Sequence, residues 1–177
     1  MKETLKTLLV GMGNPILSDD AVGIRLARDI GRRLADVPGL SVLEECSVGG
    51  LNIIEVLEGY DRVILLDSIR TAAGTPGDWH YFTSAALRET MNLSNSHDVN
   101  FATALELGRR MGIKLPAEEE IHIFAVEALD LITFSETMTE PMEKAYPEFS
   151  EAIFRAVETI VKGSETAADC SEEKGRR

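Results

Sequence analysis

The segment from Thr7 to Leu34 constrains the fold of this chain more than any other. A short apolar run predicts a buried strand over residues 6–10, and the turn residues GMGNP follow it directly. Apolar side chains then recur at helical spacing, which predicts a helix over residues 20–34 with Ser18 as its N-cap. A strand, a glycine-containing loop and a helix in this order are typical of α/β proteins, which bind ligands at the carboxyl ends of their strands.

Two acidic residues, Asp19 and Asp20, fall at the start of the predicted helix. Carboxylates in a first turn stabilise a helix by about 0.3–1 kcal/mol each, because they oppose the positive end of its dipole. They also lie where an α/β protein places its ligand site. The sequence therefore leaves a structural and a functional interpretation open, and the functional one requires partners elsewhere in the chain.

A dinucleotide-binding loop is a third interpretation of this segment. Its fingerprint is G-x-G-x-x-G, in which the last glycine allows the helix to pack closely on the strand. Gly11 and Gly13 match this pattern, but Ile16 occupies the third position. The neighbouring acids would also repel a pyrophosphate, so the sequence disfavours nucleotide binding.

Composition and charge exclude several classes of protein. A formal net charge of −12 disfavours nucleic acid and anionic membranes as partners, because both bind basic patches. No apolar run approaches the ~20 residues of a transmembrane helix, and the N-terminal residues lack the apolar region of a signal peptide. We therefore expect a cytoplasmic protein in which Cys46 and Cys170 are reduced thiols.

Strand and helix patterns alternate along the rest of the chain. Further strands are predicted at about residues 41–47, 62–69, 79–82 and 121–129, and Pro147 should kink or restart the last helix. The alternation predicts an α/β fold: a single three-layer αβα domain with a twisted, mostly parallel sheet of about five strands and helices on both faces. We assign residues 1–162 to this domain. Residues 163–177 lack apolar periodicity and are expected to form a flexible tail.

Two further polar residues are candidates for a site. Asp67 ends the apolar run RVILLDSI, where a charged group is costly unless it is paired or bound to a metal. His97 lies in the polar stretch NLSNSHDVN, just before a predicted helix. A capping or turn role remains the alternative for each. His80 and His122 fall within predicted strands, and we interpret them as ordinary strand residues.

Asp20, Asp67 and His97 form one candidate site if the sheet is doubly wound. The first and third strands are then neighbours and end at the same edge of the sheet. Two carboxylates and one imidazole suit a divalent first-row metal, and three protein ligands leave positions open for water or substrate. The spacing carries no specific signature, so this set is a hypothesis.

The chain resembles the hydrogenase maturation endopeptidases, which trim the C-terminus of the large subunit of nickel–iron hydrogenases. The resemblance covers roughly residues 8–161 and rests on the segments GMGNPILSDDAVG, RVILLDSI, SHDV and FAVEAL. Its most specific element is the opening G-x-G-N-x-x-x-x-D-D/E-x-x-G, which the chain matches at every fixed position. By this resemblance the family's three metal ligands, and with them catalysis, fall on Asp20, Asp67 and His97.

The resemblance also implies a cofactor and a partner. The partner is the large-subunit precursor, and the metal is the nickel already inserted in that precursor, so that only nickel-loaded precursor is cleaved. We further expect a monomer with no nucleic acid or membrane partner. Three residues are expected to shape the substrate cleft through close backbone approach, namely Asn14, Gly49 and Gly50.

Other functions remain compatible with the same residues. A non-catalytic, nickel-dependent checking or chaperone protein would bind the precursor through the same ligands without cutting it. A metallohydrolase with a resident metal would also use them, and a nucleotide-binding enzyme would use the glycine loop. Product formation, metal content and nucleotide binding, respectively, distinguish these alternatives.

Overall fold

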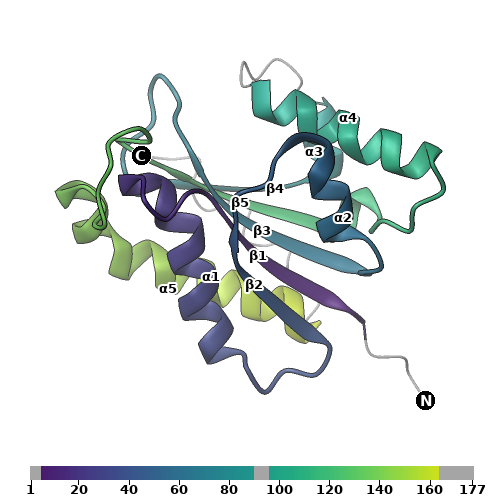
Figure 1. Ribbon diagram of the computed structural model, residues 1–177. Coiled ribbons are helices and arrows are strands. Elements are labelled where there is room, and N and C mark those ends of the chain that lie inside the picture. The colour runs from purple at the N-terminus through teal and green to yellow at the C-terminus, as the bar shows by residue number, and fades with distance from the viewer. Residues whose placement is uncertain (1–4, 90–95, 164–177) are drawn as a thin grey trace.

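A computed structural model describes residues 5–89 and 96–163 of the chain. Its single sheet has the strand order β2-β1-β3-β5-β4 (Figure 1). The strands are β1 (Thr7–Met12), β2 (Leu40–Cys46), β3 (Arg62–Ile69), β4 (Trp79–Thr83) and β5 (Ile121–Glu127). Four of them run parallel, and β4 pairs antiparallel with β5. The predicted mostly parallel sheet and the predicted pairing of the first and third strands are confirmed.

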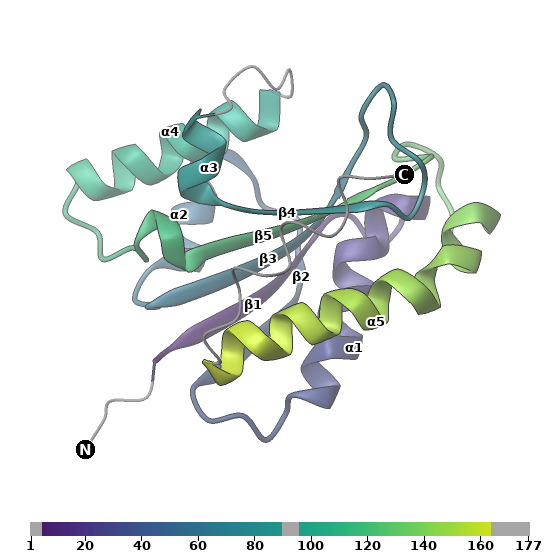
Figure 2. The same ribbon diagram turned by 180° about the vertical axis from the view of Figure 1, so that it is seen from behind.

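Helices cover both faces of the sheet, which confirms the three-layer arrangement. Helices α1 (Val22–Arg33) and α5 (Glu140–Lys162) lie on one face. Helices α2 (Ile53–Leu57), α3 (Ser84–Glu89) and α4 (Ser96–Arg110) lie on the other, as the two opposite views agree (Figure 2). Three short 3₁₀ turns complete the described elements, namely η1 (Ser18–Ala21), η2 (Gly50–Asn52) and η3 (Glu118–Glu120). Among the described residues, no helix combines the length and the apolar character needed to cross a membrane.

Strand β5 shows how the two halves of the core are divided. All seven of its residues are buried, as expected for an inner strand of a sheet that is covered on both faces. Phe124 and Val126 pack in the cluster that contains α1 and α5, whereas Ile121 and Ile123 pack in the cluster that contains α2 and α4. The alternation of side chains along one strand therefore supplies both layers.

One detail of the helices differs from the sequence prediction, and a second excludes one of the two alternatives predicted for Pro147. The chain enters α1 through the 3₁₀ turn η1, and α1 itself begins at Val22 without a side-chain cap, so Ser18 does not cap it. Helix α5 is one element from Glu140 to Lys162 with Pro147 inside it, so no new helix begins there. Tyr146 and Phe149, on either side of that proline, are buried in the core, and this packing outweighs the ~3 kcal/mol cost of an interior proline. The predicted tail lies largely outside the described residues.

The carboxylate of Asp19 is fully buried and fastens the segment after β5 to η1. Its oxygens accept hydrogen bonds from the backbone N–H groups of Leu129 (3.0 Å), Asp130 (2.9 Å) and Thr139 (2.7 Å), and from the Thr139 hydroxyl (3.0 Å). A buried charge is tolerated only when it is paired in this way. Asp19 therefore has a structural role, which differs from the helix-dipole role that the sequence suggested.

Replacing Asp19 by Asn should lower the free energy of unfolding by about 2–4 kcal/mol. The amide would turn a donor toward groups that are themselves donors. Urea unfolding followed by circular dichroism measures the change. Asp36→Asn, which removes the same charge from an exposed position, is the matched control and should stay within about 0.5 kcal/mol of the wild type. A D19N protein as stable as the control would contradict this role.

His122 is a buried titratable group on the α5 side of β5. Its Nδ1 lies 2.9 Å from the Tyr81 hydroxyl, and its buried Nε2 has no hydrogen-bond partner among the described residues. Burial lowers the pKa of His122 below its usual value, and the nearby Arg62 guanidinium lowers it further. The folded protein therefore holds this imidazole neutral where the unfolded chain would protonate it.

The stability that neutral His122 contributes is fully present above about pH 6.5 and is lost as the pH falls through its lowered folded-state pKa. Over that interval the unfolded chain binds more protons than the folded protein, so stability rises with pH. When the pH is lowered from about 7.5 to about 5.5, the free energy of unfolding should therefore fall more for the wild-type protein than for the His122→Asn variant. Urea unfolding of both proteins at the two pH values measures the difference. Equal losses would show that His122 does not carry this linkage.

Candidate active site

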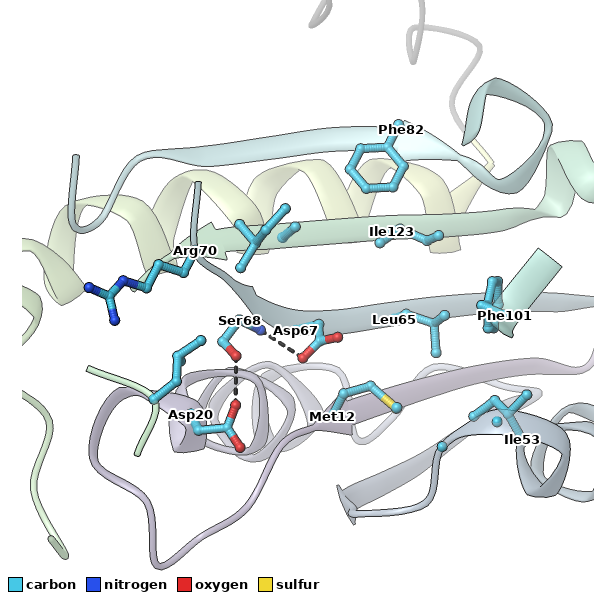
Figure 3. A pocket seen from close by; sticks show the side chains of 15 residues that line it. Met12, Asp20, Ile53, Leu65, Asp67, Ser68, Arg70, Phe82, Phe101 and Ile123 are labelled. Carbon is cyan, nitrogen blue, oxygen red and sulfur yellow. Dashed lines mark hydrogen bonds between the residues drawn. The ribbon is translucent and has the colours of Figure 1, made fainter. Parts of the chain in front are cut away.

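A cavity of about 480 Å³ lies at the carboxyl ends of β1 and β3, beside η2 (Figure 3). Its polar side chains are those of Asp20, Asp67, Ser68 and Arg70. The rest of its wall is apolar or backbone, contributed by Met12, Gly49, Gly50, Ile53, Leu65, Ile69, Phe82, Phe101, Ile123, Ala125 and Leu131. A mostly apolar cavity with a few converging polar groups is the usual form of a ligand site.

Asp20 is placed by the loop that leaves β1. One carboxylate oxygen, Oδ2, accepts the backbone N–H of Asn14 at 2.9 Å, and the other, Oδ1, accepts the Ser68 hydroxyl at 2.7 Å. The loop can close this tightly because residue 13 is glycine, with a φ of +131°. A Cβ at Gly13 would collide with the carbonyl oxygen of Asp20. Glycine is therefore required for the loop to bring Asp20 to the cavity.

Asp67 reaches the same edge of the sheet from β3. Strands β1 and β3 are parallel neighbours, and Gly11 pairs with Leu66, so Asp67 comes level with the end of β1. Its Oδ1 accepts the backbone N–H of Ser68 at 2.8 Å. Ser68 thus donates to both carboxylates, through its N–H to Asp67 and through its hydroxyl to Asp20, as the dashed lines in Figure 3 show. The structure brings these two predicted residues together.

The predicted cleft residues lie in two places. Gly49 and Gly50 line the cavity, and a Cβ added at either would meet nothing within 4 Å. Asn14 lies behind Asp20: its N–H binds that carboxylate, and its side-chain oxygen accepts the N–H of Ile16 at 3.2 Å. The two glycines therefore keep one side of the cavity open, while Asn14 positions a carboxylate.

His97 is the second residue of α4, and its side chain lies outside the described residues. Phe101, one helical turn further along α4, lines the cavity. Within the described side chains, no three His, Cys, Asp or Glu residues gather as a metal site. The three-ligand set therefore remains a prediction, of which the structure describes the two carboxylates.

Several cavity residues were not found from the sequence. Ser68 could have been considered because it follows Asp67 directly. Met12, Leu65 and Ile123 have the sequence pattern of core strand residues, and nothing in that pattern separates a cavity wall from the packed interior. Sequence patterns do not show where two layers leave a space between them.

Two carboxylates, those of Asp20 and Asp67, are the acidic side chains that line the described cavity. Cys46 does not line it, is buried, and has its thiol pKa raised mainly by burial, which disfavours the thiolate. Carboxylates, in contrast, bind divalent metals and accept protons from water. The arrangement therefore offers side chains for metal binding and for proton transfer with water.

Several solved structures are similar to this fold. The hydrogenase maturating endopeptidase HybD from E. coli is 20% identical, with a TM-score of 0.65, over 87% of this chain and 93% of that one. An endopeptidase from Escherichia coli, solved in solution, is 20% identical with a TM-score of 0.69, over 91% and 94%. The [NiFe] hydrogenase maturation protease HycI from Thermococcus kodakarensis KOD1 is 18% identical with a TM-score of 0.63, over 91% and 95%. These similarities establish the shared fold.

The sequence profile of the hydrogenase maturation protease family matches residues 24–162. The chain therefore belongs to the hydrogenase maturation protease family. The matched region includes Asp67 and His97, whereas Asp20 lies just before it. Comparison with curated protein sequences gave no match.

Filling the open side of the cavity should block proteolysis. Gly49 has an extended backbone, with φ −133° and ψ −177°, that valine also adopts, so Gly49→Val adds bulk without backbone strain. We expect at least about a tenfold loss of cleavage of a hydrogenase precursor, at unchanged thermal stability, because the side chain would occupy the path of the peptide. Gly49→Ala restricts the backbone similarly but adds one methyl group, and it should lose less. Equal activity of wild type and G49V would show that substrate does not pass there.

Proposed function

We propose that this protein is the endopeptidase that removes the C-terminal extension from a nickel-loaded large-subunit precursor of a nickel–iron hydrogenase. One observation carries the proposal. Asp20, in the 3₁₀ turn that follows β1, and Asp67, near the carboxyl end of the adjacent parallel strand β3, are joined through Ser68 at the wall of an open cavity. Membership of the hydrogenase maturation protease family supplies the reaction class.

Nickel enters this proposal as part of the substrate. Two carboxylates and the imidazole of His97 make a donor set that suits a divalent first-row metal. Each oxygen of Asp20 accepts one hydrogen bond, from Asn14 or from Ser68, and a carboxylate oxygen has a second lone pair. The contacts that hold Asp20 in place therefore leave it able to bind a metal that the precursor brings.

The protein's own contribution is to hold and orient the precursor. Ser68 and the N–H of Asn14 keep the Asp20 carboxylate turned to the cavity before substrate arrives, so no reorganisation is needed at the moment of reaction. The apolar wall binds side chains beside the cleavage point and excludes water. Bound nickel would supply polarisation of the scissile carbonyl or activation of a water.

The requirement for nickel follows from this division of roles. The protease supplies ligands and a shaped cavity, and the precursor supplies the metal that completes the site. A precursor without nickel would lack the group that anchors its cleavage point against Asp20 and Asp67. Processing would then report that nickel insertion is complete.

The test compares nickel-loaded and nickel-free precursor from the same source, with mass spectrometry of the released C-terminal peptide. Wild-type protein should release the peptide from the loaded precursor only. His97→Ala and Asp20→Ala should each reduce release by at least about a hundredfold, because each removes a group that acts at the reacting centre. Asp36→Asn, which changes an exposed acid, should process at the wild-type rate.

Other outcomes separate the alternatives. Wild-type protein that binds loaded precursor without releasing a peptide would be a checking or chaperone protein. Release from nickel-free precursor at an equal rate would overturn the nickel requirement and leave the protease assignment intact. Metal that remains bound to the protease after purification, together with nickel-independent cleavage, would identify a hydrolase with a resident metal.

A further inference from the structure

A second polar cluster lies at the carboxyl end of β5, outside the residues assigned to the site so far. The side chain of Glu127 is 3% exposed, and it accepts hydrogen bonds from the Thr71 N–H (3.0 Å) and the Thr71 hydroxyl (2.8 Å). Its Oε1 also lies 3.0 Å from Nε2 of His80. The His80 side chain itself is 51% exposed. A buried carboxylate thus holds one edge of an imidazole whose other edge faces outward.

The strand register places this cluster beside the proposed active site. Asp67 on β3 is the cross-strand partner of Ala125 on β5, and Ala125 is the cross-strand partner of His80 on β4. Cross-strand partners share a face of the sheet, and neighbouring strands lie about 4.8 Å apart. The backbones of Asp67 and His80 are therefore about 10 Å apart across a single small residue.

Two residues next to His80 line the cavity. Ala125, its cross-strand partner, lines the cavity, and so does Phe82, which is two residues along β4 on the same face. Figure 3 shows Phe82 on β4 and Asp67 on β3, with Ile123 of β5 between these strands. Asp20 and Asp67 line the cavity on the β1 and β3 side, and Phe82 lines it on the β4 side. His80 lies two residues before Phe82 on the same face of β4.

The hydrogen bonds around Glu127 determine how His80 can act. Two donors of Thr71 bind Glu127, and an ionised carboxylate can accept a third hydrogen bond from Nε2 of His80 when that nitrogen carries the hydrogen. The remaining ring nitrogen, Nδ1, is then the one available for proton transfer. Imidazole is the side chain used most often for general acid–base catalysis, and a carboxylate bound to its other nitrogen fixes its orientation.

We propose that His80 is a further catalytic residue of the peptidase and that Glu127 is its positioning residue. The inference rests on the proposed function. Water adds to the scissile carbonyl carbon, the C–N bond breaks, and the leaving nitrogen takes a proton from Nδ1 of His80. His80 regains a proton from solvent, and the proton that the water loses goes to a carboxylate of the site. His80 thus donates to the amine from the side of the cavity opposite the two carboxylates.

A purely structural role for the cluster is the alternative that a test must exclude. Glu127 fastens the segment between β3 and β4, because Thr71 binds its side chain and the Gly77 N–H binds its carbonyl oxygen at 2.9 Å. Loss of this anchor would disturb the segment that carries Arg70 to the cavity. A useful substitution must therefore keep the hydrogen bond to Glu127 and remove only the proton transfer.

His80→Gln meets this requirement, because the glutamine amide can donate to Glu127 but does not titrate. With nickel-loaded precursor we expect H80Q to lower kcat by about 10²–10⁴-fold, with KM within about twofold and the thermal midpoint unchanged. Glu127→Gln should lower kcat as well. The H80Q/E127Q double variant should be no slower than H80Q, because the two residues act as one unit. Thr71→Val removes one hydrogen bond to Glu127 and leaves His80 in place, so it measures how far a weakened anchor alone lowers stability and kcat.

Opposite results would overturn the inference. An H80Q protein with kcat within about threefold of the wild type would exclude proton transfer by His80. A loss of kcat matched by an equal loss in T71V would show that the cluster only anchors the chain. Failure of the proposed function is distinguishable: a wild-type protein that releases no peptide overturns both claims, whereas an active H80Q protein overturns only the role of His80.

Discussion

The parallel pairing of β1 with β3 is the constraint on which the rest of the site depends. Parallel neighbours end at the same edge of a sheet, so whatever follows β1 meets whatever ends β3. Here that brings Asp20 and Asp67 to one cavity, with Ser68 bound to both. The same edge receives the end of β5, where Glu127 holds His80. The ends of three parallel strands therefore place Asp20, Asp67 and Glu127 at one edge of the sheet.

The adjacent acids Asp19 and Asp20 have different roles because of the direction each faces. Asp19 is fully buried and takes four hydrogen bonds from the segment after β5, which carries Leu131 to the cavity wall. Asp20 is half-buried and turns toward the cavity. One residue joins two distant parts of the chain, and the next presents a reactive group. Both residues lie in the 3₁₀ turn η1.

The buried carboxylates illustrate a general requirement for such a site. Each buried acid discussed here, Asp19 and Glu127, is surrounded by donors, since an unpaired buried charge is costly. The two carboxylates at the cavity, those of Asp20 and Asp67, are less buried. Rigid, satisfied groups thus form the frame, and less buried groups perform the chemistry. Family membership fits this division, because a maturation protease must admit a protein substrate to an open cavity.

The sequence by itself determined the α/β class and the alternation of elements, because period and turn chemistry are local properties of the chain. It indicated Asp20 and Asp67 as partners through the assumption of a doubly wound sheet, since Asp20 follows the first predicted strand and Asp67 lies near the end of the third. Only the tertiary structure decided the roles of Asp19, Ser68 and Glu127, because hydrogen bonds between segments up to 120 residues apart leave no local pattern. The position of His80 opposite Asp67 likewise depends on strand register, which arises only when separate strands pair.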